Sequence, residues 1–168
     1  PSGEVLVRAD EDPGQLYNGP LIVLTSRHSA SASEILAGAL QDYGRAIIVG
    51  DRTTHGKGTV QQVVQFAPYL RNNLKTTNDP GALKVTISMF YRPSGSSTQL
   101  KGVAADIVLP SINNVAEIGE SETGNPLPWD RIAASEYELM NRVAPYLEEL
   151  RHRSEQRVAK AKDFAYIR

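Results

Sequence analysis

The spacing of hydrophobic and polar positions changes several times along the chain, and each spacing predicts a type of element. Residues Glu4–Arg8 alternate between polar and apolar, as in a strand with one buried face. The aliphatic runs Leu21–Leu24 and Ala46–Val49 are typical of strands buried on both faces. Between them, Glu34–Tyr43 carries apolar residues at helical spacing, and Gly44 follows as a C-cap. This order predicts a βαβ unit with two parallel strands and a right-handed crossover.

Further strands are expected after this unit. Val60–Phe66 and Leu83–Tyr91 have strongly β-forming compositions, and the stretch Ala67–Pro80 between them reads as a long excursion. Ile107–Leu109 is a short apolar run that ends at a proline. Together these segments predict an α/β fold with a mixed sheet.

The composition changes near residue 110, which divides the chain into three predicted parts. Residues 1–110 form the α/β part, and residues 111–132, with several Gly, Pro, Asn and Glu, form a connector. Residues 133–168 are predicted to be helical, with Pro145 breaking or kinking the helix at Ala144. One apolar stripe supports this helix: Leu139, Met140, Val143, Leu147 and Leu150.

Composition and charge exclude several classes of function. The 168 residues suit one ordinary domain, and a formal net charge of −1 lacks the positive bias of a nucleic-acid-binding protein. The absence of cysteine excludes disulfides, thiolate metal sites and cysteine nucleophiles. The three histidines have no metal-binding spacing, so neither a metal nor another cofactor is expected. No aliphatic run approaches the ~20 residues that span a bilayer, so no membrane span is expected.

The first candidate for chemistry is the run S-A-S-A-S-E-I, Ser29–Ile35, at the turn from strand to helix. A serine at this turn, such as Ser31, places its hydroxyl beside the free N–H groups of the first helical turn. Those N–H groups and the helix dipole suit a developing oxyanion. The same serine can also serve only as a helix N-cap, and this run alone does not separate the two interpretations.

The second candidate is the run H-G-K-G-T-V-Q, His55–Gln61, in which Lys57 lies between two glycines. A lysine returning to this edge of the sheet can be directed at Ser31. It acts as a base only when uncharged, a form that burial among apolar neighbours favours. The alternatives are a solvated or phosphate-binding lysine, although Gly58 after Lys57 does not fit a P-loop. A triad of Ser31 with His55 and Asp42 or Asp51 also stays open, but Lys57 has the better setting.

With these residues in place, the chain resembles the tail-specific (carboxy-terminal processing) proteases, serine endopeptidases that use a Ser–Lys pair. The resemblance spans roughly Leu21–Asp130 and implies the crotonase/Clp-protease-like core of that family, with residues 1–110 as the later part of the catalytic domain. The run L-P-W-D, Leu127–Asp130, points to the long periplasmic bacterial branch. The other matching stretches are Ser29–Ile35, Gln41–Ala46, Gly56–Gln62, Val85–Arg92 and Gly95–Ile107.

Carried over position by position, the resemblance assigns a role to five residues. It places the nucleophile at Ser31 and the general base at Lys57. It also implies that Gln61 positions Lys57, that the backbone N–H of Ala32 is one oxyanion donor, and that Asp42 occupies a supporting acidic position.

Four points qualify this assignment. Ser29 and Ser33 are rival nucleophiles, but the spacing to Glu34 favours Ser31. The loop Asp51–His55 is one residue longer than usual in the family. The upstream strand with the second oxyanion donor and the substrate-recognising PDZ domain are not in this sequence. We therefore expect the 168 residues alone to be inactive and prone to self-association through an open sheet edge.

The resemblance also implies partners and location. Substrates would be proteins or peptides with apolar C-termini, an adaptor lipoprotein is a further partner to consider, and the compartment would be the periplasm.

Two rival functions remain open from the sequence. One is a non-catalytic, protease-like scaffold that binds peptides at its sheet edge. The other is a crotonase-like acyl-transfer enzyme that uses an acid such as Glu34 and has no need for Lys57.

Overall fold

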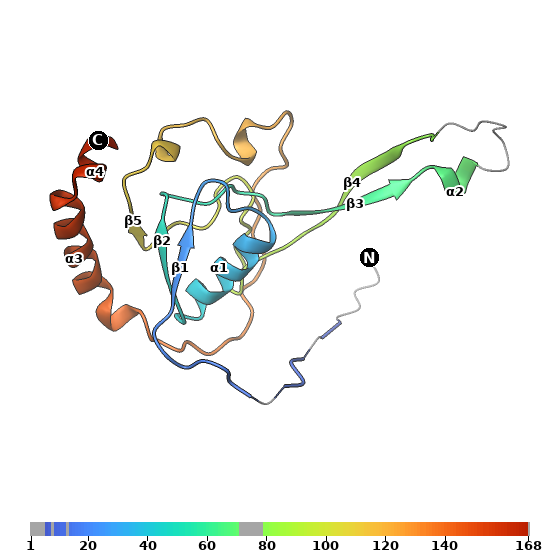
Figure 1. The fold of residues 1–168 in the computed structure, drawn as a ribbon. Helices are drawn as coiled ribbons and strands as arrows, with labels where there is room; N and C mark the ends of the chain where they lie inside the picture. Colours follow the sequence, from blue (N-terminus) through green and yellow to red (C-terminus); the bar gives the residue numbers. More distant parts are fainter. Residues whose placement is uncertain (1–5, 8, 13, 71–78, 168) are drawn as a thin grey trace.

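A three-stranded parallel sheet forms the centre of the molecule. The computed structural model describes residues 6–7, 9–12, 14–70 and 79–167. Its central sheet has the order β1-β2-β5, with β1 at Ile22–Thr25, β2 at Ile47–Gly50 and β5 at Ile107–Val108. The helix α1, Ala32–Asp42, connects β1 to β2 and covers one face of the sheet (Figure 1). The predicted βαβ unit and the α/β class are confirmed.

The hydrophobic core lies between α1 and this sheet. Ala37 of α1 packs with Ile48 of β2 and with Val103, and all three are at most 1% exposed. The opposite face of β1 is open, because Ile22 is 61% exposed and Leu24 is 75% exposed. The prediction that this strand is buried on both faces is therefore wrong, since α1 covers only one face of β1.

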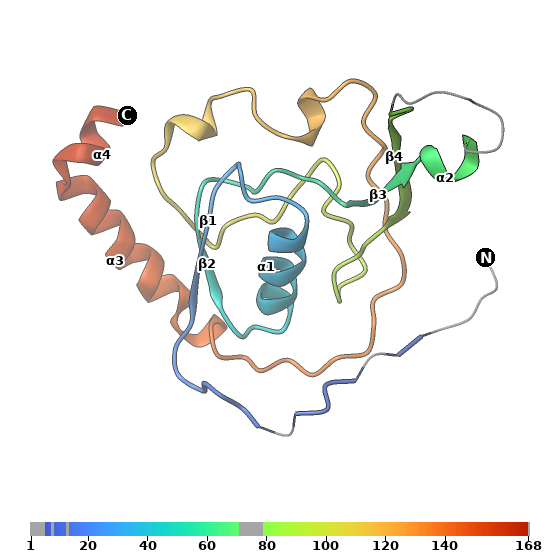
Figure 2. The same cartoon turned by 45° about the vertical axis from the view of Figure 1, so that its right-hand side comes forward.

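The strands β3, Thr59–Gln65, and β4, Ala82–Met89, form an antiparallel hairpin that projects from the body of the molecule (Figures 1 and 2). They make a second sheet rather than joining the first one. The short helix α2, Ala67–Leu70, follows β3. Of the predicted excursion, residues 71–78 lie outside the described residues, as do 4, 5 and 8 of the predicted strand Glu4–Arg8. Leu6 and Val7 of that strand are exposed and not in a strand.

Residues 133–167 are helical only from residue 144, and the segment before that passes the end of α1 at Tyr43 and Gly44. Residues 133–143 have no regular secondary structure, so the prediction of a helix from Ala133 is wrong there. Pro145 lies in the first turn of the helical segment instead of breaking it, a position where its missing N–H costs nothing. The elements are the 3₁₀ turns Ile112–Asn114, Glu120–Glu122 and Ala144–Tyr146, then α3, Leu147–Lys160, and α4, Lys162–Ile167.

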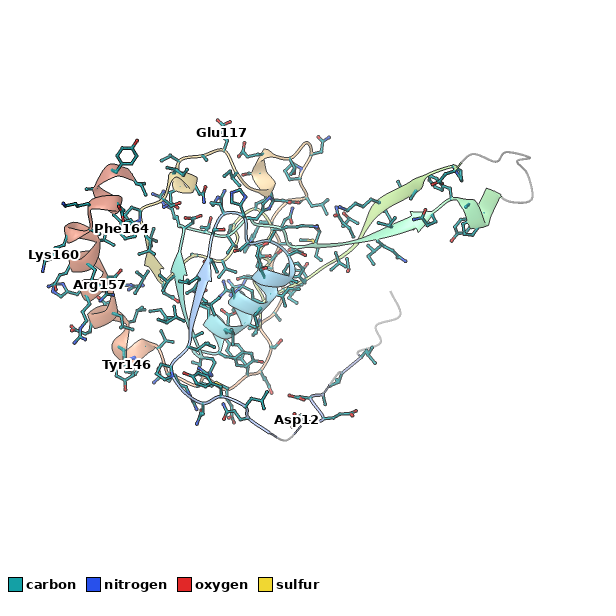
Figure 3. All side chains as sticks on the ribbon, viewed as in Figure 1. Asp12, Glu117, Tyr146, Arg157, Lys160 and Phe164 are labelled. Atoms are coloured by element: carbon teal, nitrogen blue, oxygen red, sulfur yellow. The ribbon has the colours of Figure 1, made fainter. Side chains whose placement is uncertain are left out.

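The helix α3 lies beside β5, away from the hairpin; the labelled side chains of Arg157, Lys160 and Phe164 follow the course of α3 and α4 in Figure 3. The Nε of Arg151 donates a hydrogen bond of 2.9 Å to the carbonyl oxygen of Asp106, next to β5. Within the described ranges, no helix is both long and apolar enough to cross a membrane.

Candidate active site

Ser31 lies at the N-cap of α1 with a backbone conformation that is unusual for a side-chain-bearing residue. Its φ of 57° and ψ of −111° fall outside the regions that L-residues favour. Such a conformation costs roughly 1–3 kcal/mol and persists only where the surroundings enforce it. Among the described residues, three other non-glycine residues have a positive φ: Leu100 beside the Lys57 loop, Asn125 in the cavity next to it, and Asn141 against Gly44 at the other end of α1.

The turn at Ser31 leaves a free donor at the start of α1. The N–H groups of Glu34 and Ile35 both donate to the carbonyl oxygen of Ser31, and that of Ser33 donates to Ala30. Within the part of the chain that the structure describes, the N–H of Ala32 makes no hydrogen bond. It is thus available to an oxyanion that forms beside Ser31.

Glu34 connects the Ser31 turn to the Lys57 loop. Its side chain is fully buried, at 0% exposure, and one carboxylate oxygen accepts hydrogen bonds from the N–H groups of Ser31, at 2.8 Å, and Lys57, at 2.9 Å. The other oxygen accepts from the Thr54 hydroxyl and from the N–H of Gly56, at 2.7 Å. One carboxylate therefore fixes the two predicted catalytic segments relative to each other.

The remaining backbone groups of the Lys57 loop are bound as well. The carbonyl oxygen of Gly56 accepts from the N–H of Leu100 at 2.7 Å, and the N–H of Gly58 donates to Gln99 Oε1 at 2.8 Å. The carbonyl of Gly58 accepts from the N–H of Phe90 at 3.0 Å. A Cβ on Gly58 would lie 2.6 Å from the backbone nitrogen of Gln99, so only glycine fits there. These contacts fix the backbone of the Lys57 loop on both sides of the lysine.

The amine of Lys57 points toward Gln61. Lys57 Nζ donates a hydrogen bond of 3.1 Å to Gln61 Oε1, so the structure brings these two predicted residues together. A register shift between Val60 and Gln61 marks a bulge at this point in the hairpin. A bulge redirects the side chains beside it. Both residues line a cavity of about 360 Å³ whose other walls include Thr59, Thr86, Glu120 and Asn125.

The surroundings of Lys57 differ from the sequence expectation. The predicted burial among apolar side chains is not found among the described residues, because the cavity walls are mainly polar and Lys57 is half-buried. In this structure the loop is held by hydrogen bonds to buried polar groups, and the apolar core lies elsewhere.

The rival serine and the histidine triad have other partners in the structure. The Oγ of Ser29 accepts a hydrogen bond from the N–H of Ser26 at 3.1 Å, inside the turn. His55 faces Glu120, with 3.8 Å between Nδ1 and the carboxylate. Asp51 accepts from the N–H of Arg27 and from the Asn113 amide. Burial alone would raise the pKa of Asp51, but these hydrogen bonds outweigh it and lower the pKa below its usual value. Asp51 therefore acts as a structural acceptor.

Asp42 lies at the far end of α1 from Ser31, about 16 Å along the helix at 1.5 Å per residue. Its carboxylate forms a two-pronged ion pair with Arg92 and accepts a hydrogen bond of 3.1 Å from the N–H of Ser94. Burial alone would raise the pKa of Asp42, but the hydrogen bonds from Arg92 and Ser94 outweigh it and hold the pKa below its ordinary 3.8. This position gives Asp42 no contact with Ser31 or Lys57.

We expect Asp42→Asn to reduce stability rather than catalysis. Because the folded-state pKa is depressed, the carboxylate stabilises the fold above its unfolded-state pKa, and this contribution is lost as the pH falls through the folded-state pKa. Asp42→Asn should therefore cost about 1–3 kcal/mol of unfolding free energy at pH 7 and progressively less as the pH is lowered into the acid range through the folded-state pKa. Urea unfolding across this pH range measures the effect, with Asp163→Asn, at an exposed site on α4, as the control. A cost that is independent of pH would contradict it.

Sequence reasoning missed three residues of this site as positioning groups: Glu34, Gln99 and Glu120. One signal for Glu34 was available, because Ser31-x-x-Glu34 has the form of a capping box, and the N–H of Ser31 does donate to the Glu34 carboxylate. Gln99 and Glu120 gave no local signal, since their partners lie far away in the sequence.

Comparisons with known proteins show the family of the chain. Residues 3–109 match the model of Peptidase family S41. The chain belongs to this family. Residues 114–168 match a second model, described as the C-terminal domain of tail specific protease. The lysine loop thus lies in the peptidase part, and Glu120 lies in the C-terminal domain.

Individual relatives of this S41 chain carry related names. A tail-specific protease of Haemophilus influenzae is 48% identical over 134 residues, covering 79% of this chain and 19% of that protein. A carboxy-terminal-processing protease of Bartonella bacilliformis is 42% identical over 105 residues, covering 62% and 21%. The solved photosystem II D1 C-terminal processing protease is 39% identical, with a TM-score of 0.43 over 54% of this chain and 20% of that one. The chain thus spans about a fifth of the length of these relatives.

Proposed function

We propose that this chain supplies the catalytic pair of a serine endopeptidase that processes proteins at their C-terminal tails. Ser31 is the nucleophile, Lys57 is the general base, and Gln61 orients Lys57. One observation carries the proposal: a single oxygen of the buried Glu34 carboxylate accepts from the backbone N–H groups of both Ser31 and Lys57. That contact holds a strained serine turn and the lysine loop together at one end of α1.

The proposed reaction proceeds through an acyl-enzyme. Uncharged Lys57 accepts the proton of the Ser31 hydroxyl as Oγ bonds to the peptide carbonyl carbon. The N–H of Ala32 donates to the resulting oxyanion. Lys57 then gives its proton to the leaving amine as the C–N bond breaks. Lys57 accepts a proton from the water that attacks the ester carbon of the acyl-enzyme, and returns it to Ser31 Oγ as the ester bond breaks, which releases the new C-terminal carboxyl group.

The decisive test replaces the nucleophile in the full-length protease. Ser31→Ala should lower kcat by at least ~10³-fold, because no neighbouring hydroxyl can take its place. Ser33→Ala is the matched control, since Ser33 is exposed in the same turn, and it should keep nearly full activity. The assay is cleavage of an unstructured protein with an apolar C-terminus. Ser31→Ala with wild-type turnover would refute the proposal.

Gln61→Ala should have a smaller effect than loss of either reacting residue. Gln61 only orients the Lys57 amine through its 3.1 Å hydrogen bond, so we expect kcat to fall by about 10- to 100-fold with KM little changed. Gln62→Ala, on the next exposed residue of β3, is the control and should behave as wild type. A Gln61→Ala enzyme as active as that control would remove the orienting role.

Two rival functions make different predictions. A crotonase-like enzyme that uses Glu34 as an acid is disfavoured, because Glu34 is fully buried and both its oxygens are occupied. A non-catalytic scaffold would bind peptides without cleaving them, so wild-type protein would leave the assay substrate intact.

We further propose proteins or peptides with apolar C-termini as the substrates, the periplasm as the compartment, and an adaptor lipoprotein as a partner to test. The 168 residues alone are proposed to be inactive.

A further inference from the structure

The C-terminal domain reaches back to the lysine loop through the 3₁₀ turn Glu120–Glu122. The N–H of Glu120 donates a hydrogen bond of 3.0 Å to the carbonyl oxygen of His55, two residues before Lys57. The side chain of Glu120 lies in the wall of the cavity that holds Lys57 and Gln61. A residue from the C-terminal domain is therefore part of the immediate surroundings of the base.

Gln99 connects Glu120 to the other side of the same loop. Its side chain is fully buried, at 0% exposure. Its Oε1 accepts from the N–H of Gly58, and its Nε2 donates to Glu120 Oε1 at 3.2 Å and to the carbonyl oxygen of Leu127 at 3.1 Å. An amide with two donors and one acceptor bound cannot rotate without breaking hydrogen bonds in a buried site. Glu120 thus fixes the orientation in which Gln99 holds Gly58.

His55 gives Glu120 a second contact with the loop. The Nδ1 of His55 is buried and has no hydrogen-bond partner among the described residues, and it lies 3.8 Å from Glu120 Oε2. The N–H of His55 donates to the carbonyl of Ser29 in the nucleophile turn at 2.9 Å. Glu120 Oε2 therefore lies near His55 at the start of the segment His55–Gly58, and Glu120 Oε1 is linked to Gly58 at its end through Gln99.

We propose that Glu120 is a positioning residue that sets the reach of Lys57 toward Ser31. It acts through Gln99 and His55, and it makes the C-terminal domain a component of the catalytic site. The proposal rests on the proposed Ser–Lys function. Loss of the Glu120 carboxylate removes one of the three hydrogen bonds of the Gln99 amide and the acidic group beside His55 Nδ1, so the loop that carries Lys57 is held less tightly. A displacement of about 1 Å at a reacting group can cost ~10²-fold in rate.

The test uses the full-length protease and three variants at the same turn. Glu120→Ala removes both side-chain contacts. Glu120→Gln keeps an oxygen that can accept from Gln99 Nε2 but loses the charge that faces His55. Glu122→Ala is the matched control, because Glu122 is exposed in the same turn and its carboxylate contacts only Ser121 among the described residues. The readouts are kcat, KM, melting temperature and the rate at which a p-nitrophenyl ester acylates Ser31 with release of p-nitrophenolate.

We expect Glu120→Ala to lower kcat and the Ser31 acylation rate together by ~10- to 100-fold, with a much smaller change in KM. Glu120→Gln should recover a substantial part of both rates, and Glu122→Ala should match wild type. A purely structural role would lower the melting temperature without slowing acylation of the folded enzyme. Wild-type acylation in Glu120→Ala, or an equal loss in Glu122→Ala, would overturn the proposal.

Two additions keep the result decisive. If Glu120→Ala does not fold, Glu120→Asp replaces it, since it keeps the charge and shortens the side chain by one methylene; slowed acylation supports the proposal and wild-type acylation overturns it. Lys57→Ala is measured in the same series. An active Lys57→Ala enzyme would refute the proposed function itself, whereas an inactive Lys57→Ala enzyme beside a fully active Glu120→Ala enzyme would refute only the role of Glu120.

Discussion

A full-length protease carrying Lys57→Ala should lose at least ~10³-fold of kcat, because no other group is left to accept the proton of the Ser31 hydroxyl. Its fold should persist, since the hydrogen bonds of the loop come from backbone groups of residues 56–58 and not from the lysine side chain. Lys57→Arg should be equally inactive, because a guanidinium stays charged and cannot act as a base.

The control for this experiment is Lys84→Ala, at an exposed lysine on β4. The measurements are steady-state cleavage of an unstructured protein with an apolar C-terminus, and far-UV circular dichroism to confirm folding. If Lys57→Ala cleaved the substrate within a few-fold of Lys84→Ala, the Ser–Lys mechanism would be refuted, and a different base would have to be sought.

Replacing Glu34 with glutamine should damage both stability and catalysis. The Glu34 carboxylate accepts four hydrogen bonds in a fully buried site, and an amide offers only one oxygen to those donors. Its NH₂ group would face backbone N–H groups of the Ser31 turn or the Lys57 loop. We expect an unfolding free energy lower by about 3–5 kcal/mol and a kcat lower by ~10²-fold in the molecules that remain folded.

Urea unfolding and kcat at a temperature where the variant is folded measure these two effects. Glu148→Gln is the matched control, because the Glu148 side chain is 87% exposed on α3, and it should change neither quantity appreciably. A Glu34→Gln enzyme as stable and active as this control would mean that the buried carboxylate does not hold the Ser31 turn and the Lys57 loop together.

The sequence was sufficient for the elements whose signals are local. The βαβ unit and the positions of the two hairpin strands follow from local composition and spacing, but their antiparallel pairing comes from the structure; Gly44 caps α1 as predicted, with a φ of 61°. The irregular segment 133–143 was not predicted, because distant contacts override its helical spacing. The N–H of Met140 donates to the carbonyl of Tyr43 at 2.8 Å, that of Arg142 donates to Gly44 at 2.9 Å, and Tyr137 packs edge-on against Tyr43.

In the candidate site, too, the residues within local motifs were predicted from the sequence, and the residues that contact them from distant segments were not. Ser31, Lys57 and Gln61 lie in two short motifs, so the family resemblance could assign a role to each of them, and the structure places Gln61 against Lys57. The groups that position them were not identifiable in this way. Gln99 reaches Gly58 across 41 residues and Glu120 across 21, and only the folded chain brings them together.

Trapping the acyl-enzyme tests the central proposal most directly. The full-length protease is mixed with a slowly hydrolysed ester or peptide substrate, quenched in acid during the first turnover, and digested for peptide mass mapping. The account predicts one acyl group on Ser31, with Ser29 and Ser33 unmodified, and none in Lys57→Ala. An acyl group on another residue, or turnover with no covalent intermediate on Ser31, would contradict it.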